Sequence, residues 1–169
     1  MGDITPLRFS DQEFKCVLVF GLYHNLEHGL DVAISETYRV LATGGVVCAS
    51  CRADNIQTRF TDYLSGKKKK NGEDEREARL FHKMNLNKKE YGKLFTRAGF
   101  VVDSILPVEN MPVLYKFRFF RSSGHIEFDE NLARAEGYRL SWFRQKLQDF
   151  LMKFFPDQFC NVYVLTASK

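Results

Sequence analysis

Polar side chains that could take part in catalysis follow a short apolar run near the start of the chain. Residues 16–20 (CVLVF) lead into a turn at Gly21, where Tyr23, His24 and Asn25 come together. The unperturbed pKa of histidine lies near neutrality, so His24 suits the role of a general base. Gly21 has no Cβ, which permits a ligand to approach the backbone closely. The alternative is that His24 only packs at the start of a helix, and Tyr23 has the same two interpretations.

A second pattern, Cys48-Ala-Ser-Cys51 together with His24 and His28, could suggest a zinc site. Cys48 falls inside an expected strand, however, where residues three apart point to opposite faces. The chain has no second C-x-x-C pair. We therefore expect structural cysteines, a solvated or packing His28 and no bound metal.

The elements that must position these side chains form a βαβ unit. Residues 16–20 are apolar and valine-rich, as in a strand buried on both faces. Helical spacing follows over 29–41, and Gly44-Gly45 is expected to end that helix. A second apolar run at 46–49 predicts a strand, parallel to the first through a right-handed crossover.

The remaining elements follow from period and capping signals. Asn87 and Glu90 predict a capping box, and Pro156 stops the long helix near the end of the chain. The expected elements are a helix at 55–64, a charged loop at 66–76, a helix at 87–97, a strand at 100–108, a short helix at 112–120, a helix at 139–155 and a strand at 159–167.

Composition restricts the class of protein. The chain has 169 residues, 44% of them hydrophobic, which predicts one domain over 1–169. No apolar stretch approaches the ~20 residues that span a bilayer, and nothing indicates secretion, so we expect a cytoplasmic protein. The net charge of +4 is mixed in sign, and neither nucleic acid nor membrane is predicted as a partner.

The aromatic stripes at 115–120 and 142–155 are expected in a core or lid, with an amphipathic surface for a lipid-like acceptor or a membrane as the alternative.

Four segments in this order resemble the second half of a class I S-adenosylmethionine-dependent methyltransferase of the type 11-like group. They are GDITPLRFSDQEF, CVLVFGLYHNL, ETYRVLATGGVV and FHKMNLNKKEYGKLFTRAGFVV. The resemblance covers roughly residues 1–108 and resumes at the closing strand. It implies an α/β, Rossmann-like three-layer sandwich, with an α-helical insertion or lid at 109–157 before the last strand.

The resemblance also implies roles for particular residues. Asp3 and Ile4 would meet the adenine of S-adenosylmethionine. The strand end at Phe20, Gly21 and Leu22 would lie beside the methionine part of the cofactor. His24, with Tyr23 next to it, would face the transferred methyl group and an acceptor that the sequence does not identify.

The chain departs from the family in lacking the opening strand and the glycine-rich loop of the first motif. We expect this region to be supplied by something other than this chain. The chain would then be a fragment of a longer product, half of a split enzyme, or a non-catalytic partner that completes another chain. Cofactor binding by the isolated chain is expected to be weak or absent. The open sheet edge is expected to recruit a second chain, the missing N-terminal half, or another copy in a homo-oligomer.

Overall fold

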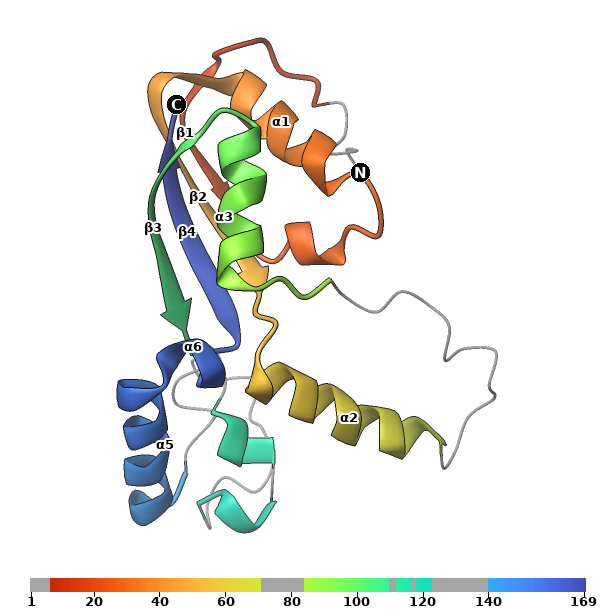
Figure 1. Ribbon diagram of the computed structural model, residues 1–169, viewed down its shortest axis with the longest axis vertical. Coiled ribbons are helices and arrows are strands. Elements are labelled where there is room, and N and C mark those ends of the chain that lie inside the picture. The colour runs from red at the N-terminus through yellow and green to blue at the C-terminus, as the bar shows by residue number, and fades with distance from the viewer. Residues whose placement is uncertain (1–6, 71–83, 110–111, 117, 123–139) are drawn as a thin grey trace. The chain divides into compact units, whose positions relative to one another are not determined.

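The computed structural model describes residues 7–70, 84–109, 112–116, 118–122 and 140–169 (Figure 1). The chain divides into two compact units. Unit 1 comprises Met1–Asp54, Asp74–Leu106 and Tyr163–Lys169, and unit 2 comprises Asn55–Glu73 and Pro107–Val162. That they form one domain, as expected from the sequence, stays a prediction.

Unit 1 is built on a four-stranded sheet of order β1-β2-β4-β3 (Figure 1). The strands are β1 (Phe14–Val19), β2 (Leu41–Arg52), β3 (Val101–Val108) and β4 (Val162–Ser168). β1 and β2 are parallel, with Val17 opposite Val47 and Val19 opposite Ala49. Helix α1 (Leu30–Val40) connects them, so the predicted βαβ unit is confirmed.

The last strand, β4, lies between β2 and β3 and runs antiparallel to β3. Asn161 N donates to Val108 O, and the hydroxyls of Ser104 and Thr166 are 2.7 Å apart, so residue numbers rise along one strand as they fall along the other. This pairing makes the sheet mixed. The predicted α/β class and the antiparallel closing strand are confirmed.

The start of β2 differs from the prediction, because α1 ends at Val40 and the strand begins at once at Leu41. Gly44, with φ of 74°, lies inside β2, where the register with β1 is interrupted. A Cβ on Gly45 would come within 2.9 Å of the carbonyl oxygen of Lys15. The two glycines therefore permit an irregular, close strand pairing, and the prediction that they end the helix was wrong.

Two helices, α1 and α3 (Lys88–Arg97), cover the same face of the sheet (Figure 1). α3 begins with the predicted capping box: Asn87 Oδ1 accepts from Glu90 N at 2.9 Å, and a Glu90 oxygen accepts from Asn87 N at 3.3 Å. The core between helices and sheet consists mainly of aliphatic and aromatic side chains, including Ile34, Leu41, Val47, Tyr91, Phe95 and Leu165. These apolar contacts fix the helices on this face.

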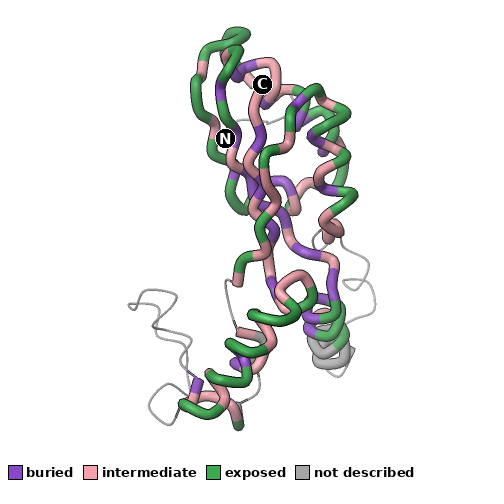
Figure 2. The backbone as a smooth tube through the Cα atoms, turned by 60° about the vertical axis from the view of Figure 1, so that its left-hand side comes forward, coloured by how far each residue is buried: buried purple, intermediate pink, exposed green. Residues whose placement is uncertain are grey.

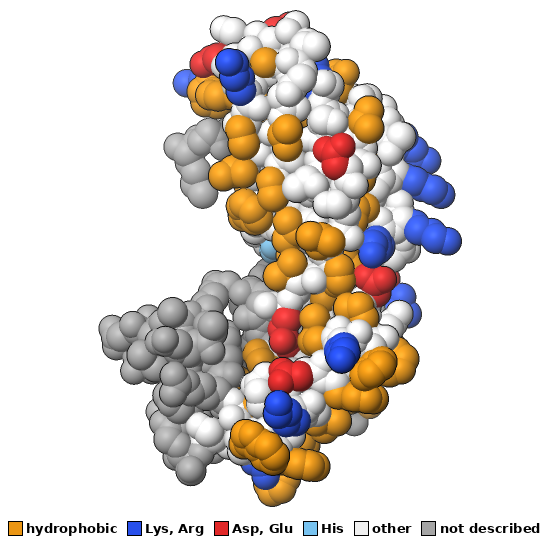
Figure 3. All heavy atoms as spheres, turned by 90° about the vertical axis from the view of Figure 1, so that its left-hand side faces the viewer, with side chains coloured by type: hydrophobic (Ala, Val, Ile, Leu, Met, Phe, Trp, Pro, Cys, Tyr) orange, Lys and Arg blue, Asp and Glu red, His pale blue; other side chains and the backbone are white. Residues whose placement is uncertain are grey.

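The opposite face of the sheet is covered by no described helix of unit 1. Burial alternates along the strands: Val19 and Ala49 are buried, whereas Leu18 is 66% exposed and Val46 is also exposed (Figure 2). Apolar and uncharged side chains predominate on the sheet surface in the upper part of Figure 3. The described residues of unit 1 thus supply two of the three layers that the sequence predicts.

Unit 2 is helical. It contains α2 (Ile56–Lys70), the 3₁₀ helices η3 (Val113–Lys116) and η4 (Arg118–Phe120), α5 (Trp142–Phe154) and α6 (Pro156–Phe159). α5 and α6 precede β4, as the predicted helical insertion requires. α2 continues to Lys70, so the prediction of a charged loop at 66–76 was wrong for residues 66–70. Residues 71–76 lie outside the described residues.

Candidate functional site

The candidate site begins where β1 ends. Gly21 has φ of 70°, and no atom comes within 4 Å of the position that a Cβ would occupy. Its N–H donates to Ser50 Oγ at 3.0 Å, near the carboxyl end of β2, and its carbonyl accepts from the Asn25 side-chain amide. These bonds hold a bare stretch of backbone open to a ligand at the edge where parallel strands bind ligands.

The residues on either side of Gly21 form an apolar rim. Phe20 is 58% exposed and Leu22 is also exposed. Large exposed apolar side chains next to an accessible glycine can contact the apolar part of a small ligand. The structure places Phe20, Gly21 and Leu22 just after the end of β1, and their contact with the methionine part of a cofactor stays a prediction.

His24 lies in the 3₁₀ turn η1 (Tyr23–Asn25) that follows this rim. Its side chain is half-buried, with Nδ1 inside, and its carbonyl accepts from Met84 N at 2.8 Å. Leu86 N donates in turn to Arg52 O, so residues 84–86 run beside the end of β2. His24 is thus held at the carboxyl edge of the sheet by backbone bonds to a segment distant in sequence.

Tyr23 points the other way, into the core of unit 1. Its side chain is fully buried, and its hydroxyl lies 2.7 Å from Thr37 Oγ1. Thr37 donates to Ala33 O, so the Tyr23 hydroxyl is the donor in this bond. Burial raises the pKa of Tyr23 to about 12. The neutral, buried Tyr23 side chain therefore anchors the turn in the core, and Asn25 and His24 remain nearer the surface.

Asp3 and Ile4, the residues expected at the adenine, lie outside the described residues.

The four cysteines are free thiols: Cys16 is exposed, Cys48 is half-buried, and Cys51 and Cys160 are buried. Cys51 is buried, and burial raises its pKa to about 12. Cys48 is half-buried, and its pKa is raised by burial and by the nearby Cys16. No group of three side chains able to hold a metal ion occurs within the described ranges. The expected absence of a metal stays a prediction.

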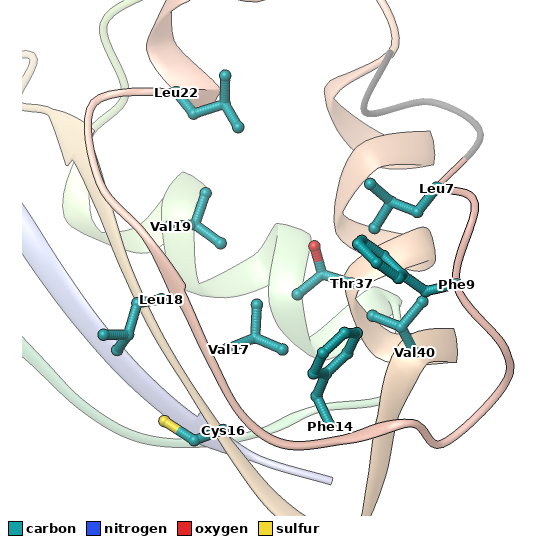
Figure 4. A pocket seen from close by; sticks show the side chains of 10 residues that line it. All are labelled: Leu7, Phe9, Phe14, Cys16, Val17, Leu18, Val19, Leu22, Thr37 and Val40. Carbon is teal, nitrogen blue, oxygen red and sulfur yellow. The ribbon is translucent and has the colours of Figure 1, made fainter. Parts of the chain in front are cut away.

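A feature that the sequence did not indicate is an apolar groove of about 320 Å³ along the free edge of β1 (Figure 4). In Figure 4, Val17 and Val19 point toward α1, whereas Cys16 and Leu18 point to the other side of the strand. The apolar residues of the loop before β1 complete the lining, notably Leu7 and Phe9. Only their position beside the outer edge of β1 gives these residues a role, and the sequence alone cannot show that position.

This loop is held by an ion-pair cluster, which is a second feature that was not predicted from the sequence. Arg39 on α1 binds Glu36 and Asp11, at 2.9 and 2.6 Å, and donates to the carbonyls of Leu7 and Phe9. The Arg39 bonds lower the pKa of Glu36. The i, i+3 spacing of Glu36 and Arg39 was the available signal, because such pairs meet on a helix surface.

No protein-family model matches the chain, and no curated protein matches it. Solved structures do share its fold. A chain from a complex that contains the Haloferax volcanii Trm112 methyltransferase activator matches with a TM-score of 0.58 and 12% identity, over 99% of this chain and 58% of that one. A SAM-dependent methyltransferase from Thermotoga maritima matches with a TM-score of 0.54 and 14% identity, over 99% of this chain and 62% of that one. A SAM-dependent methyltransferase from Archaeoglobus fulgidus matches with a TM-score of 0.54 and 13% identity, over 95% of this chain and 62% of that one.

The chain therefore spans about three fifths of the length of these structural relatives. No helix in the described part of the chain has the length and apolarity needed to cross a membrane. At such low identity the likeness concerns the fold alone. The fold of this chain matches part of the Rossmann-like fold of SAM-dependent methyltransferases.

Proposed function

We propose that the chain carries the acceptor-side part of an S-adenosylmethionine-dependent methyltransferase, acting on an acceptor not yet identified. The observation that carries this proposal is the turn at Gly21 and His24 at the carboxyl end of β1, in a sheet of order β1-β2-β4-β3. In open α/β sheets, ligands bind outside the carboxyl ends of the strands. The fold likeness to SAM-dependent enzymes supports this choice of cofactor.

The described residues fit the methionine end of this cofactor. Open space over Gly21 leaves room for the chain of a ligand, and Phe20 and Leu22 offer apolar contact on both sides. Asp3 and Ile4 are proposed for the adenine, where a carboxylate accepts from the amino group. When bound, the cofactor supplies an electrophilic methyl group on a sulfonium.

His24 is proposed as the group that takes the proton from the acceptor. It is anchored through its backbone to Met84, and Tyr23 beside it is hydrogen-bonded to Thr37, so the backbone from which the imidazole extends is held in place. A positioned base typically contributes 10²–10⁴-fold to the rate. Tyr23 was predicted beside His24 as a catalytic residue, and its buried hydroxyl supports a positioning role.

The proposed partner is a strand-and-helix segment that pairs with β1. Parallel sheets are normally covered on both faces, yet β1 is an edge strand with an apolar sequence and an exposed Leu18. Such a segment would add a strand beside β1 and a helix over the bare face. The same surface favours the alternative function, a non-catalytic chain that completes another protein, or a homo-oligomer formed through this edge.

The test uses the assembly that copurifies with the chain through a carboxyl-terminal tag from its source cells. Methyl transfer from radiolabelled S-adenosylmethionine is measured for wild type, His24→Ala and His28→Ala. His28 is the matched control, a solvent-exposed histidine four residues away. We expect His24→Ala to lower kcat at least about 100-fold with little change in KM for the cofactor. Unchanged kcat in His24→Ala would refute its role, and an assembly without transfer activity would favour the non-catalytic alternative.

A further inference from the structure

Helix α5 of unit 2 exposes a continuous aromatic stripe. Phe143, Leu147, Phe150 and Phe154 follow one another at spacings of four, three and four residues, so they lie on one side of the helix. All four are exposed, Phe143 by 74%, and the neighbouring Trp142 is 77% exposed. An exposed apolar surface of this extent marks an interaction site.

The burial pattern of α5 is also the reverse of that of an ordinary surface helix. Its one buried residue is Gln148, which is 0% exposed and donates to Glu109 Oε1. A helix that packs on a globular core normally turns its phenylalanines inward and its amides to water. α5 does the reverse, so its aromatic stripe is placed to bind something other than the described residues of unit 2.

Basic side chains flank the stripe on both sides. In helical projection, Lys146 and Lys153 lie on one flank and Arg144 on the other, while Asp149 is the single carboxylate of α5. The Arg144 guanidinium lies 4.1 Å from the ring centre of Phe119, which is itself exposed and extends the apolar surface. The lower part of Figure 3 shows basic side chains beside apolar ones, with acidic side chains also on this surface.

We propose that α5 docks on an anionic membrane surface. The stripe enters the boundary between headgroups and acyl chains, and the flanking cations contact lipid phosphates, which is how amphipathic helices bind in the plane of a bilayer. Aromatic side chains at the centre and cations at the rim match this anionic surface. A neutral protein partner would leave the three cations without opposite charges. This inference is independent of methyl transfer.

Trp142 is the chain's only tryptophan and reports directly on the stripe. The full chain is titrated with vesicles of phosphatidylcholine alone or mixed with phosphatidylglycerol. We expect a blue shift of its emission with the anionic vesicles, quenching by brominated acyl chains, and weaker binding as salt rises. Replacing Phe143 and Phe150 by serine should lower the vesicle affinity at least about tenfold.

The matched control is Val101→Ser, which removes an exposed apolar side chain from β3 in unit 1 and should leave vesicle binding unchanged. Circular dichroism checks that each variant remains folded. Two results would overturn the proposal: no spectral change with anionic vesicles, or undiminished binding by the Phe143 and Phe150 variant. A blue shift that rises with protein concentration in the absence of lipid would identify a contact between copies of the chain instead, and would also overturn it.

Discussion

Leu18 in β1 is the register partner of Cys48 in β2, and both side chains lie on the sheet face that no described helix of unit 1 covers. Parallel pairing of this kind is normally buried from both sides. β1 is moreover the last strand of the sheet on its side, and its only exposed charge is Lys15. The strand thus has the composition of an interior strand in the position of an edge.

We predict that this edge mediates association. Leu18→Lys should leave the stability of the isolated chain nearly unchanged, because the side chain is already exposed. It should weaken self-association or pairing with a partner at least about tenfold, since pairing would bury the new charge. Light scattering over a wide concentration range measures this. Val101→Lys on the opposite edge strand β3 is the control, and a wild-type chain that stays monomeric throughout would contradict the homo-oligomer.

Tyr23 should make stability depend on high pH. Its pKa is raised from 10.0 to about 12 in the folded chain, so the unfolded chain loses this proton first. Stability from the neutral phenol is complete below pH 10 and is lost as pH rises toward 12. Wild type should lose up to about 3 kcal/mol more than Tyr23→Phe across this window.

At neutral pH the same Tyr23→Phe variant should be about 1 kcal/mol less stable, because the bond to Thr37 is gone. Denaturant titrations at a series of pH values measure both effects. Cys51 also has a raised pKa, but it is present in both proteins, so its contribution cancels in the comparison. The pKa of Tyr91 is raised mainly by burial and in part by Tyr23, so both proteins are compared in a Tyr91→Phe background. Parallel pH profiles for the two proteins would contradict the assignment.

Arg39 should control the loop before β1. Arg39→Ala removes the bonds to Leu7, Phe9 and Asp11 that hold residues 7–12 against α1. We expect faster amide hydrogen exchange at Gln12, whose N–H is bonded to the carbonyl of residue 39, with little change in α3. Lys93→Ala, an exposed change on α3, is the control and should leave the loop protected. Equal protection of Gln12 in both variants would contradict this prediction, because the apolar contacts of the loop would then hold it in place without Arg39.

Asn55 should stabilise unit 2. Its side chain accepts from Thr58 N at the start of α2 and donates to the carbonyls of Asp157 and Cys160. Asn55→Ala removes a helix cap and the donor to two carbonyls, of which that of Cys160 is buried, so we expect a loss of about 1–3 kcal/mol in thermal or denaturant unfolding. Ile56→Ala, at the exposed first position of α2, should cost less than about 0.5 kcal/mol. Similar losses in the two variants would contradict this role.

Local signals explain which parts of the fold could be predicted. The Asn87–Glu90 capping box and the apolar run of β1 act within a few residues, and both appear where expected. The strand irregularity at Gly44 depends on how β2 pairs with β1, which no local pattern contains. The same holds at the candidate site. The polar turn could be located, but the burial of Tyr23 depends on Thr37, which lies on the next helix.

We propose that this chain holds only part of a cofactor site, and isothermal titration calorimetry of the isolated chain with S-adenosylmethionine tests this proposal. The rim at Phe20, Gly21 and Leu22 offers apolar contact and open backbone, while the relatives are longer by roughly two fifths of their length. A hydrogen bond to a charged group of the cofactor is worth about 1.5–3 kcal/mol, so a site that lacks several of them would bind with millimolar instead of micromolar affinity, or more weakly. We predict no measurable micromolar binding by residues 1–169 alone. A micromolar dissociation constant for the isolated chain would contradict the account.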